Sequence, residues 1–271
     1  MIQVLDCTLR DGGYYTNWDF EENLTKNYFE SMEKLPVQYI EIGYRSLLSN
    51  DYKGEYNFCP DYVISRARKY MPSKKIGVIL NEKEIRVEDL DRLLGSCKGK
   101  LDFIRMAVDP SNLGRAKVTA AEIRNMGFEV GFNVMYMSKW TSQYPDFINS
   151  LLSLNGVVDS FAMVDSFGSM MPEQVSQITK AVKSVLKCKI GFHGHNNIEL
   201  AFANTLAAID AGCDIVDATI TGMGRGAGNL RTELLLSYLS SNKGLEIDFN
   251  SLSITVADFE RLKEKYRWGT N

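Results

Sequence analysis

The feature that most constrains this sequence is a repeated alternation of short strand-like runs with longer amphipathic stretches. Runs rich in β-branched and aromatic residues recur roughly every thirty residues along the chain. This alternation is typical of βα units built around a parallel sheet. The candidate strands lie at residues 2–5, 37–42, 75–80, 103–107, 129–135, 157–163, 189–192 and 215–220.

Eight such units in 271 residues predict an α/β fold, namely a single (β/α)8 TIM barrel spanning residues 1–271. The last helix is expected at about residues 251–267. A doubly wound open sheet shares this periodicity and is the competing arrangement. The eight units, without a glycine-rich turn after the first strand, favour the barrel.

Composition and charge exclude several classes of protein. A net charge of -3, with no run of basic residues, gives no field that would attract nucleic acid. The five cysteines are scattered and contain no C-x-x-C pair, which argues against a disulfide framework and against a thiolate zinc site. No signal-peptide pattern and no run of eighteen apolar residues is present. We therefore expect a soluble cytoplasmic protein without a membrane partner.

The two histidines mark the most specific candidate site. His193 and His195 are the only histidines in the chain, and residues two apart in an extended segment point to the same side. Catalytic groups of such barrels lie at the C-terminal ends of the strands. Two imidazoles that converge there make half of a metal site. The alternative is a pair of loop histidines that only form hydrogen bonds.

A third metal ligand should come from another strand end. Asp11 is the preferred candidate because a carboxylate with two imidazoles suits Mg²⁺, Mn²⁺, Fe²⁺ or Zn²⁺. Its alternative role is that of a turn residue before two glycines. Asp165 is a rival ligand, or it shapes a turn together with Ser166. Asn229 can cap a helix, bind the metal or contact the substrate.

Arg10 and Glu41 are the candidates for charge at the reacting centre. The Arg10 guanidinium could hold a substrate carboxylate or a developing enolate oxygen, or it could form a salt bridge with Glu41. Because a lone buried carboxylate is costly, this pairing would satisfy both side chains. Tyr14 and Tyr15 can donate protons at the barrel mouth or simply pack there.

A glycine-rich run, residues 222–229, follows the eighth candidate strand. Its glycines, including Gly224 and Gly226, allow backbone N–H groups to approach a ligand closely. Barrels often bind phosphate near their last two loops. The run lacks the spacing of a P-loop.

Five ordered motifs resemble those of one enzyme superfamily. They are L-R-D-G, I-E-I-G, V-D-S-F-G-S-M-M-P, H-G-H-N-N and G-M-G-R-G-A-G-N, associated with the first, second, sixth, seventh and eighth strands. Together they are similar to the DRE-TIM metallolyases, the superfamily of 3-hydroxy-3-methylglutaryl-CoA lyase, over nearly the whole chain. Residues 194–218 look most similar to the catalytic domain of the 4-hydroxy-2-oxovalerate aldolases.

The resemblance implies a divalent cation, Mn²⁺ or Mg²⁺, with Zn²⁺ as a further candidate. It places Asp11, His193 and His195 on the metal, with Asn229 as a further ligand. It also implies that Arg10 stabilises an enolate and that Glu41 is the glutamate of the superfamily's name.

The function implied is that of a metal-dependent carbon–carbon lyase, an aldolase that cleaves or forms a 4-hydroxy-2-oxo acid through a pyruvate-type enolate. Its partners would be a small 2-oxo acid and an aldehyde, and a homo-oligomer is expected. Residues expected at the substrate are Asp165, Ser166, Gly224 and Gly226. An acyl-CoA lyase or synthase, and a catalytically silent barrel that serves as a binding subunit, are the alternatives.

Two departures from the aldolases stand out. Tyr14 occupies the position of their catalytic histidine, three residues after the metal aspartate, so Tyr14 becomes the candidate for proton transfer. The C-terminal extension with which those aldolases dock an aldehyde dehydrogenase is expected to be absent, because the sequence ends soon after the expected final helix. We therefore expect no dehydrogenase partner.

Overall fold

The strands form a closed parallel barrel in sequence order, from β1 to β8 and back to β1. The computed structural model describes residues 2–48, 51–143 and 146–270. The strands are β1 (Gln3–Asp6), β2 (Tyr39–Tyr44), β3 (Lys75–Asn81), β4 (Phe103–Val108), β5 (Glu129–Val134), β6 (Ser160–Asp165), β7 (Lys189–Gly194) and β8 (Ile215–Ala218). The predicted barrel is confirmed, and the open sheet is excluded by the pairing of β1 with β8.

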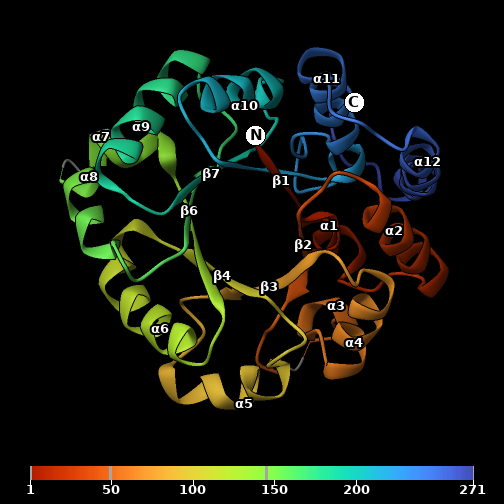
Figure 1. The fold of residues 1–271 in the computed structure, drawn as a ribbon, viewed down its shortest axis with the longest axis horizontal. Coiled ribbons are helices and arrows are strands. Elements are labelled where there is room, and N and C mark those ends of the chain that lie inside the picture. The colour runs from red at the N-terminus through yellow and green to blue at the C-terminus, as the bar shows by residue number, and fades with distance from the viewer. Residues whose placement is uncertain (1, 49–50, 144–145, 271) are drawn as a thin grey trace.

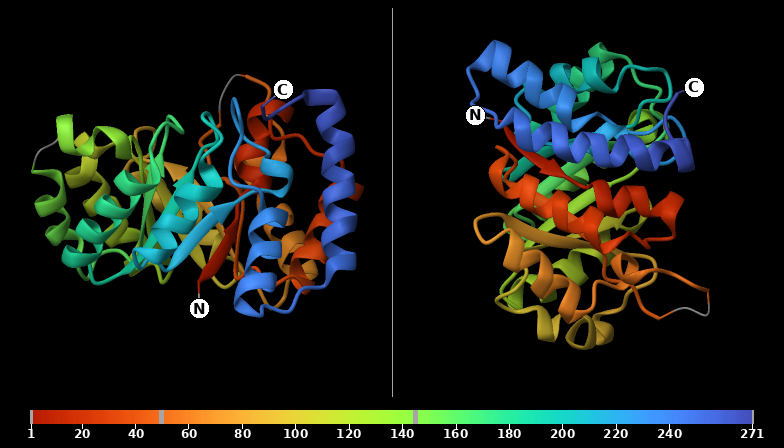
Figure 2. Two further views of the ribbon diagram at one scale, coloured as in Figure 1. Left: turned by 90° about the horizontal axis from the view of Figure 1, so that it is seen from above. Right: turned by 90° about the vertical axis from the view of Figure 1, so that its right-hand side faces the viewer.

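Helices surround the barrel as an outer layer (Figure 1). They are α1 (Thr8–Thr16), α2 (Glu22–Lys34), α3 (Glu55–Phe58), α4 (Asp61–Tyr70), α5 (Leu90–Leu94), α6 (Leu113–Asn125), α7 (Trp140–Gln143), α8 (Phe147–Ser150), α9 (Pro172–Val185), α10 (Ala201–Asp210), α11 (Thr232–Lys243) and α12 (Phe249–Tyr266). The last helix, expected at 251–267, is α12. It packs beside α2, where the Asn27 amide donates to Asp258 over 2.9 Å (Figure 2).

The segment after β1 is a helix. The alternative role of Asp11 as a turn residue before two glycines is wrong, because Asp11, Gly12 and Gly13 lie inside helix α1. These glycines are needed for close packing rather than for a turn. A Cβ on Gly12 would lie 2.3 Å from the Met223 sulfur, and one on Gly13 would lie 2.0 Å from the Trp18 ring. Tertiary packing therefore outweighs the low helix propensity of glycine here.

Two groups of buried side chains fill the two sides of the strands. A large apolar cluster packs between the strands and the helices. The barrel interior holds a much smaller one, made of Leu5, Cys7, Tyr39, Phe103 and Ile215. Above this apolar floor, toward the C-terminal ends of the strands, the interior side chains are polar and charged. None of the described helices is both long and apolar enough to span a membrane.

Candidate metal centre

A cavity of about 670 Å³ opens at the C-terminal ends of the strands. Its lining includes the predicted residues Arg10, Asp11, His193 and His195. A smaller cavity of about 270 Å³ lies below, and its lining includes Leu5 and other residues of the apolar floor. The upper cavity is therefore the one that matches the predicted chemistry.

The two histidines reach the centre from β7 and from the residue just beyond it. His193 places Nε2 3.4 Å from Asp11 Oδ2 and Nδ1 3.0 Å from Asp217 Oδ2. His195 Nδ1 lies 2.8 Å from the main-chain oxygen of Asp165. A carbonyl only accepts hydrogen bonds, so this contact places the proton of neutral His195 on Nδ1 and leaves Nε2 free to bind a cation.

Burial helps to keep His195 neutral. Burial, followed by the neighbouring His193, lowers the pKa of His195 to about 4. At neutral pH the His195 ring therefore carries no charge. A neutral imidazole is the form that binds metals.

Asp11 is held as a carboxylate between several donors. Burial alone would raise its pKa, but Arg10, the two histidines and the amide of Asn229 together outweigh burial and lower it. The Asn229 amide nitrogen donates to Asp11 Oδ2 over 2.7 Å. The Asn229 oxygen, by contrast, is buried and has no hydrogen-bond partner among the described residues. An orphaned buried acceptor at this position fits a cation ligand.

Cys7 also lies beside the centre. The ligand atoms of Cys7, Asp11 and His193 all lie within 4.8 Å of one another. Burial raises the pKa of the Cys7 thiol well above its usual range, so the sulfur keeps its proton at neutral pH. His195 lies outside this trio, with its ring 4.9 Å from that of His193 between centroids. Sequence reasoning did not single out Cys7.

Arg10 joins two carboxylates. Its Nη1 contacts Asp11 Oδ1, and its Nε donates to Glu41 Oε1 over 2.7 Å. The third nitrogen, Nη2, is buried and has no partner among the described residues. The predicted salt bridge between Arg10 and Glu41 is therefore present, and it leaves one guanidinium donor uncommitted.

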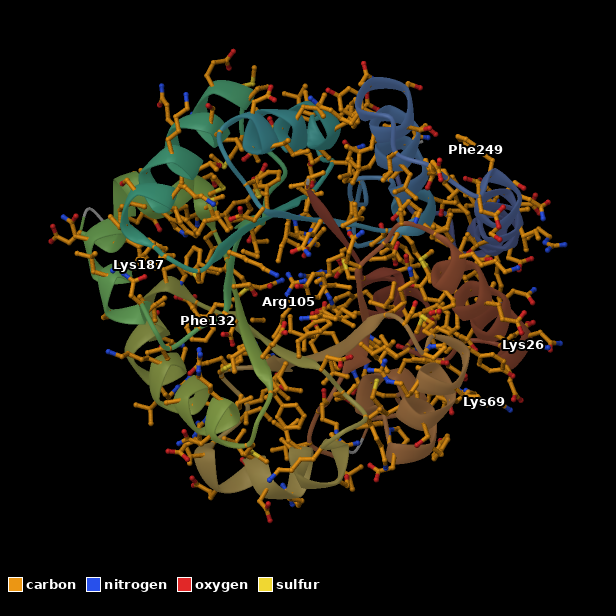
Figure 3. All side chains as sticks on the ribbon, viewed as in Figure 1. Lys26, Lys69, Arg105, Phe132, Lys187 and Phe249 are labelled. Carbon is orange, nitrogen blue, oxygen red and sulfur yellow. The ribbon has the colours of Figure 1, made fainter. Side chains whose placement is uncertain are left out.

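A second arginine continues this chain of charges across the barrel. Arg105, near the centre of the ring of strands in Figure 3, donates through Nη2 to Asp217 Oδ2 over 2.6 Å. Its Nε lies 3.5 Å from Glu41 Oε2 and donates to Asn133 over 2.5 Å. Because Asp217 also contacts His193, the contacts close into a loop. We call this loop the charge ring, and its members are Asp11, Arg10, Glu41, Arg105, Asp217 and His193.

The charge ring fits a bound cation. Its three carboxylates face two guanidinium groups, which leaves one negative charge when both histidines are neutral. An uncompensated charge buried in protein is costly. A divalent cation beside Asp11 would therefore be stabilised by the surrounding charge as well as by its ligands.

Tyr14 lies at the rim of the cavity and is 38% exposed. Its hydroxyl is 2.9 Å from that of Tyr44, which also lines the cavity and was not singled out from the sequence. Burial, followed by the effect of Tyr14, raises the pKa of Tyr44 well above its usual range. Tyr44 therefore keeps its proton and can donate it to the Tyr14 oxygen.

The other predicted substrate residues occupy different positions. Ser166 and Gly226 line the cavity. The Asp165 carboxylate accepts hydrogen bonds from the main-chain N–H groups of Ser169 and Met170. The contact of Asp165 with His195 is made by its main-chain carbonyl oxygen instead. Gly224 lies against Asn229, where an added Cβ would come within 2.5 Å of the amide nitrogen.

We predict that Asp217→Asn weakens binding of Mn²⁺ about 10- to 100-fold, because the carboxylate that orients His193 is lost. Isothermal titration measures this affinity. Asp214→Asn, which removes a carboxylate facing Lys183, is the control and should bind Mn²⁺ like the unmodified protein. Equal affinities for both variants would contradict the orienting role of Asp217.

Comparisons with known proteins identify the family of this chain. The HMGL-like family model matches residues 104–260. A 4-hydroxy-2-oxovalerate aldolase from Roseiflexus castenholzii is 30% identical over 253 residues, covering 90% of this chain and 73% of that protein. An oxaloacetate decarboxylase from Mycobacterium tuberculosis is 29% identical over 239 residues, covering 87% of this chain and 69% of that protein.

Solved structures show the same fold. The N-terminal domain of a protein from Bacteroides vulgatus, provisionally described as an aldolase, has a TM-score of 0.97 and 49% identity, covering 100% of this chain and 90% of that one. Rhizobium etli pyruvate carboxylase has a TM-score of 0.80 at 18% identity, covering 98% of this chain and 28% of that one, which supports the fold alone. The family model and the relatives that match most of this chain together show its family. It belongs to the HMGL-like family.

Proposed function

We propose that this protein is a divalent-metal-dependent aldolase that cleaves or forms a 4-hydroxy-2-oxo acid through a pyruvate-type enolate. Its similarity to 4-hydroxy-2-oxovalerate aldolases over most of the chain supports the reaction class. Asp11, His193 and His195 would hold the cation, with the Asn229 oxygen as a further ligand. Mn²⁺ and Mg²⁺ suit this oxygen and nitrogen set, and Zn²⁺ is a further candidate. Such a cation supplies Lewis-acid stabilisation of negative charge on oxygen.

The observation that best supports this proposal is the unpaired Nη2 group of Arg10. Glu41 and Asp11 hold the guanidinium in place, so Nη2 is fixed and buried without a partner among the described residues. A fixed donor that finds its partner only when charge develops on a substrate oxygen stabilises a transition state with little reorganisation. An enolate oxygen is such a partner.

The charge balance supports an anionic substrate. With His193 neutral, the charge ring carries one net negative charge, and one divalent cation changes it to one positive charge. The carboxylate of a 2-oxo acid would then bring the buried cluster to neutrality. Neutral clusters are cheaper to bury than charged ones.

Exchange of the methyl protons of pyruvate tests the proposal without an aldehyde. In D₂O with Mg²⁺, the protein should convert the methyl group to its deuterated form, as followed by proton NMR. A chelator should stop the exchange, and His193→Ala should lack it, whereas Asp214→Asn should retain it. A metal-loaded protein that left the methyl protons in place would contradict the enolate chemistry and favour a catalytically silent barrel.

Arg10→Lys should lower this exchange rate about 100- to 1000-fold, the usual effect of losing one fixed transition-state donor. A lysine ammonium has three donors but no rigid planar fork, so it cannot hold Glu41 and Asp11 in the same directions while it presents a fixed donor to the substrate. Initial rates at saturating pyruvate measure the effect. Near-normal exchange by the lysine variant would show that Arg10 has only a structural role.

Tyr14 is the proposed group for proton transfer at the 4-hydroxyl. If Tyr44 donates to the Tyr14 oxygen, the Tyr14 hydroxyl proton is free to be given to the aldehyde oxygen during addition. In the cleavage direction, a Tyr14 oxygen without its proton, stabilised by the Tyr44 hydrogen bond, would accept the 4-hydroxyl proton.

Tyr14→Phe should therefore lower the rate of aldol cleavage by about a hundredfold or more, because positioned acid–base groups contribute about 10² to 10⁴. The ring is kept, so affinity for Mg²⁺ should be unchanged. Cleavage of a 4-hydroxy-2-oxo acid, followed by coupled detection of pyruvate, gives the rate. An unchanged cleavage rate in Tyr14→Phe would show that a group other than Tyr14 accepts the proton.

Decarboxylation of a dicarboxylic 2-oxo acid is the second candidate, because an oxaloacetate decarboxylase is among the relatives. Loss of carbon dioxide from oxaloacetate leaves the same enolate, so the cation and Arg10 would serve both reactions. The aldolase is preferred because several curated relatives carry that activity. Comparing kcat/KM for oxaloacetate and for a 4-hydroxy-2-oxo acid decides between the two reactions.

Compartment and assembly remain predictions. All five cysteines are free, and the cytoplasmic location stays a prediction. The expected homo-oligomer and the expected lack of a dehydrogenase partner can be tested by light scattering and by co-purification.

A further inference from the structure

We propose that Arg225 selects the second substrate, an aldehyde that carries a carboxylate or phosphate group. This inference rests on the proposed aldolase function and names the class of its aldehyde. In the addition direction, a bond forms between pyruvate C3 and the aldehyde carbon. The proton lost from C3 is balanced by one gained at the new hydroxyl, so no further reactant is needed.

Arg225 projects from a loop whose backbone is held in place. It is the one charged side chain between Gly222 and Gly228. The Gly228 N–H donates to the Arg225 carbonyl over 3.1 Å, and the neighbouring Gly226 carbonyl accepts from Tyr15 and from the Gly269 N–H. The Arg225 side chain therefore extends from a fixed backbone position at the rim of the cavity.

The charge of Arg225 is uncommitted. Its guanidinium carbon lies 4.3 Å from the centre of the Tyr14 ring, and no carboxylate among the described residues forms an ion pair with it. Acidic side chains on the same cavity are already engaged. Arg115 binds Glu82, and the Ser111 amide and hydroxyl donate to Asp109. An anionic substrate group would give Arg225 the partner that the protein does not supply.

The position of Arg225 suits an acidic group at the end of the aldehyde that is remote from its carbonyl carbon. Asp11, Tyr14 and Arg225 line one cavity, and Tyr14 lies one helical turn after Asp11. Side chains three residues apart on a helix are roughly 5–6 Å apart at Cβ. An aldehyde whose acidic group lies about two to four bonds beyond the carbonyl carbon spans a separation of this order. Stacking on the Tyr14 ring holds the Arg225 guanidinium beside the space that such an aldehyde would occupy.

Matched pairs of aldehydes test the proposal. Pyruvate addition is measured with succinic semialdehyde against butanal, and with glyceraldehyde 3-phosphate against glyceraldehyde. We expect kcat/KM to be about tenfold higher or more for at least one acidic member, because charge-assisted hydrogen bonds are stronger than neutral ones. The preferred pair identifies the anion. Equal values within both pairs would overturn the proposal.

Variants of Arg225 test whether this residue causes the preference for acidic aldehydes. Arg225→Met should lose the preference mainly through KM for the acidic aldehyde, and Arg225→Lys should recover part of it. The control is Lys53→Met, which removes a cation stacked on the Trp18 ring outside this cavity and should keep the full preference. A preference that survives in Arg225→Met would show that another group selects the anion.

Pyruvate methyl exchange separates this inference from the proposed function. Exchange needs no aldehyde, so a wild-type protein that exchanges but shows no preference contradicts only the role of Arg225. A wild-type protein that does not exchange contradicts the aldolase itself. A loss of addition by Arg225→Met that is equal for charged and neutral aldehydes would assign Arg225 to loop support and overturn its selecting role.

Discussion

The buried charge ring is the interaction on which the rest of this centre depends. Its contacts run from Asp11 through Arg10, Glu41, Arg105 and Asp217 to His193, so side chains from α1, β2, β4, β7 and β8 hold one another in place. Removing one partner of a buried ion pair typically costs about 3–5 kcal/mol, because the other charge is left unpaired. The same contacts that hold the proposed metal ligands therefore also constrain the barrel interior.

This arrangement separates two kinds of chemistry within one cavity. Groups that would stabilise an enolate, such as Arg10 and His193, are buried and form ion pairs or hydrogen bonds with neighbouring side chains. Groups that would meet the variable part of a substrate, such as Tyr14 and Arg225, lie at the exposed rim. A change at the rim can therefore alter which aldehyde binds without removing a charge from the ring below.

Much of the fold could be predicted from the sequence because strand and helix periodicities are local properties. The eight strands and the last helix were placed within a few residues. Arg105 and Asp217 were missed because their roles arise from contacts between strands distant in sequence, 112 residues apart. A charged residue inside an otherwise apolar strand was the available signal. The helix around Gly12 was missed because its packing partner, Met223, lies at the other end of the chain.

The pairing of β1 with β8 has a consequence for synthesis on the ribosome. Arg10 and Glu41 emerge early, whereas His193, Asp217 and Asn229 emerge only after most of the chain has been made. Until the barrel closes, neither half contains the complete set of opposite charges or of proposed metal ligands. On the proposed function, a nascent chain would be unable to capture a cation tightly until the eighth strand has docked, so metal loading would mark the completion of folding.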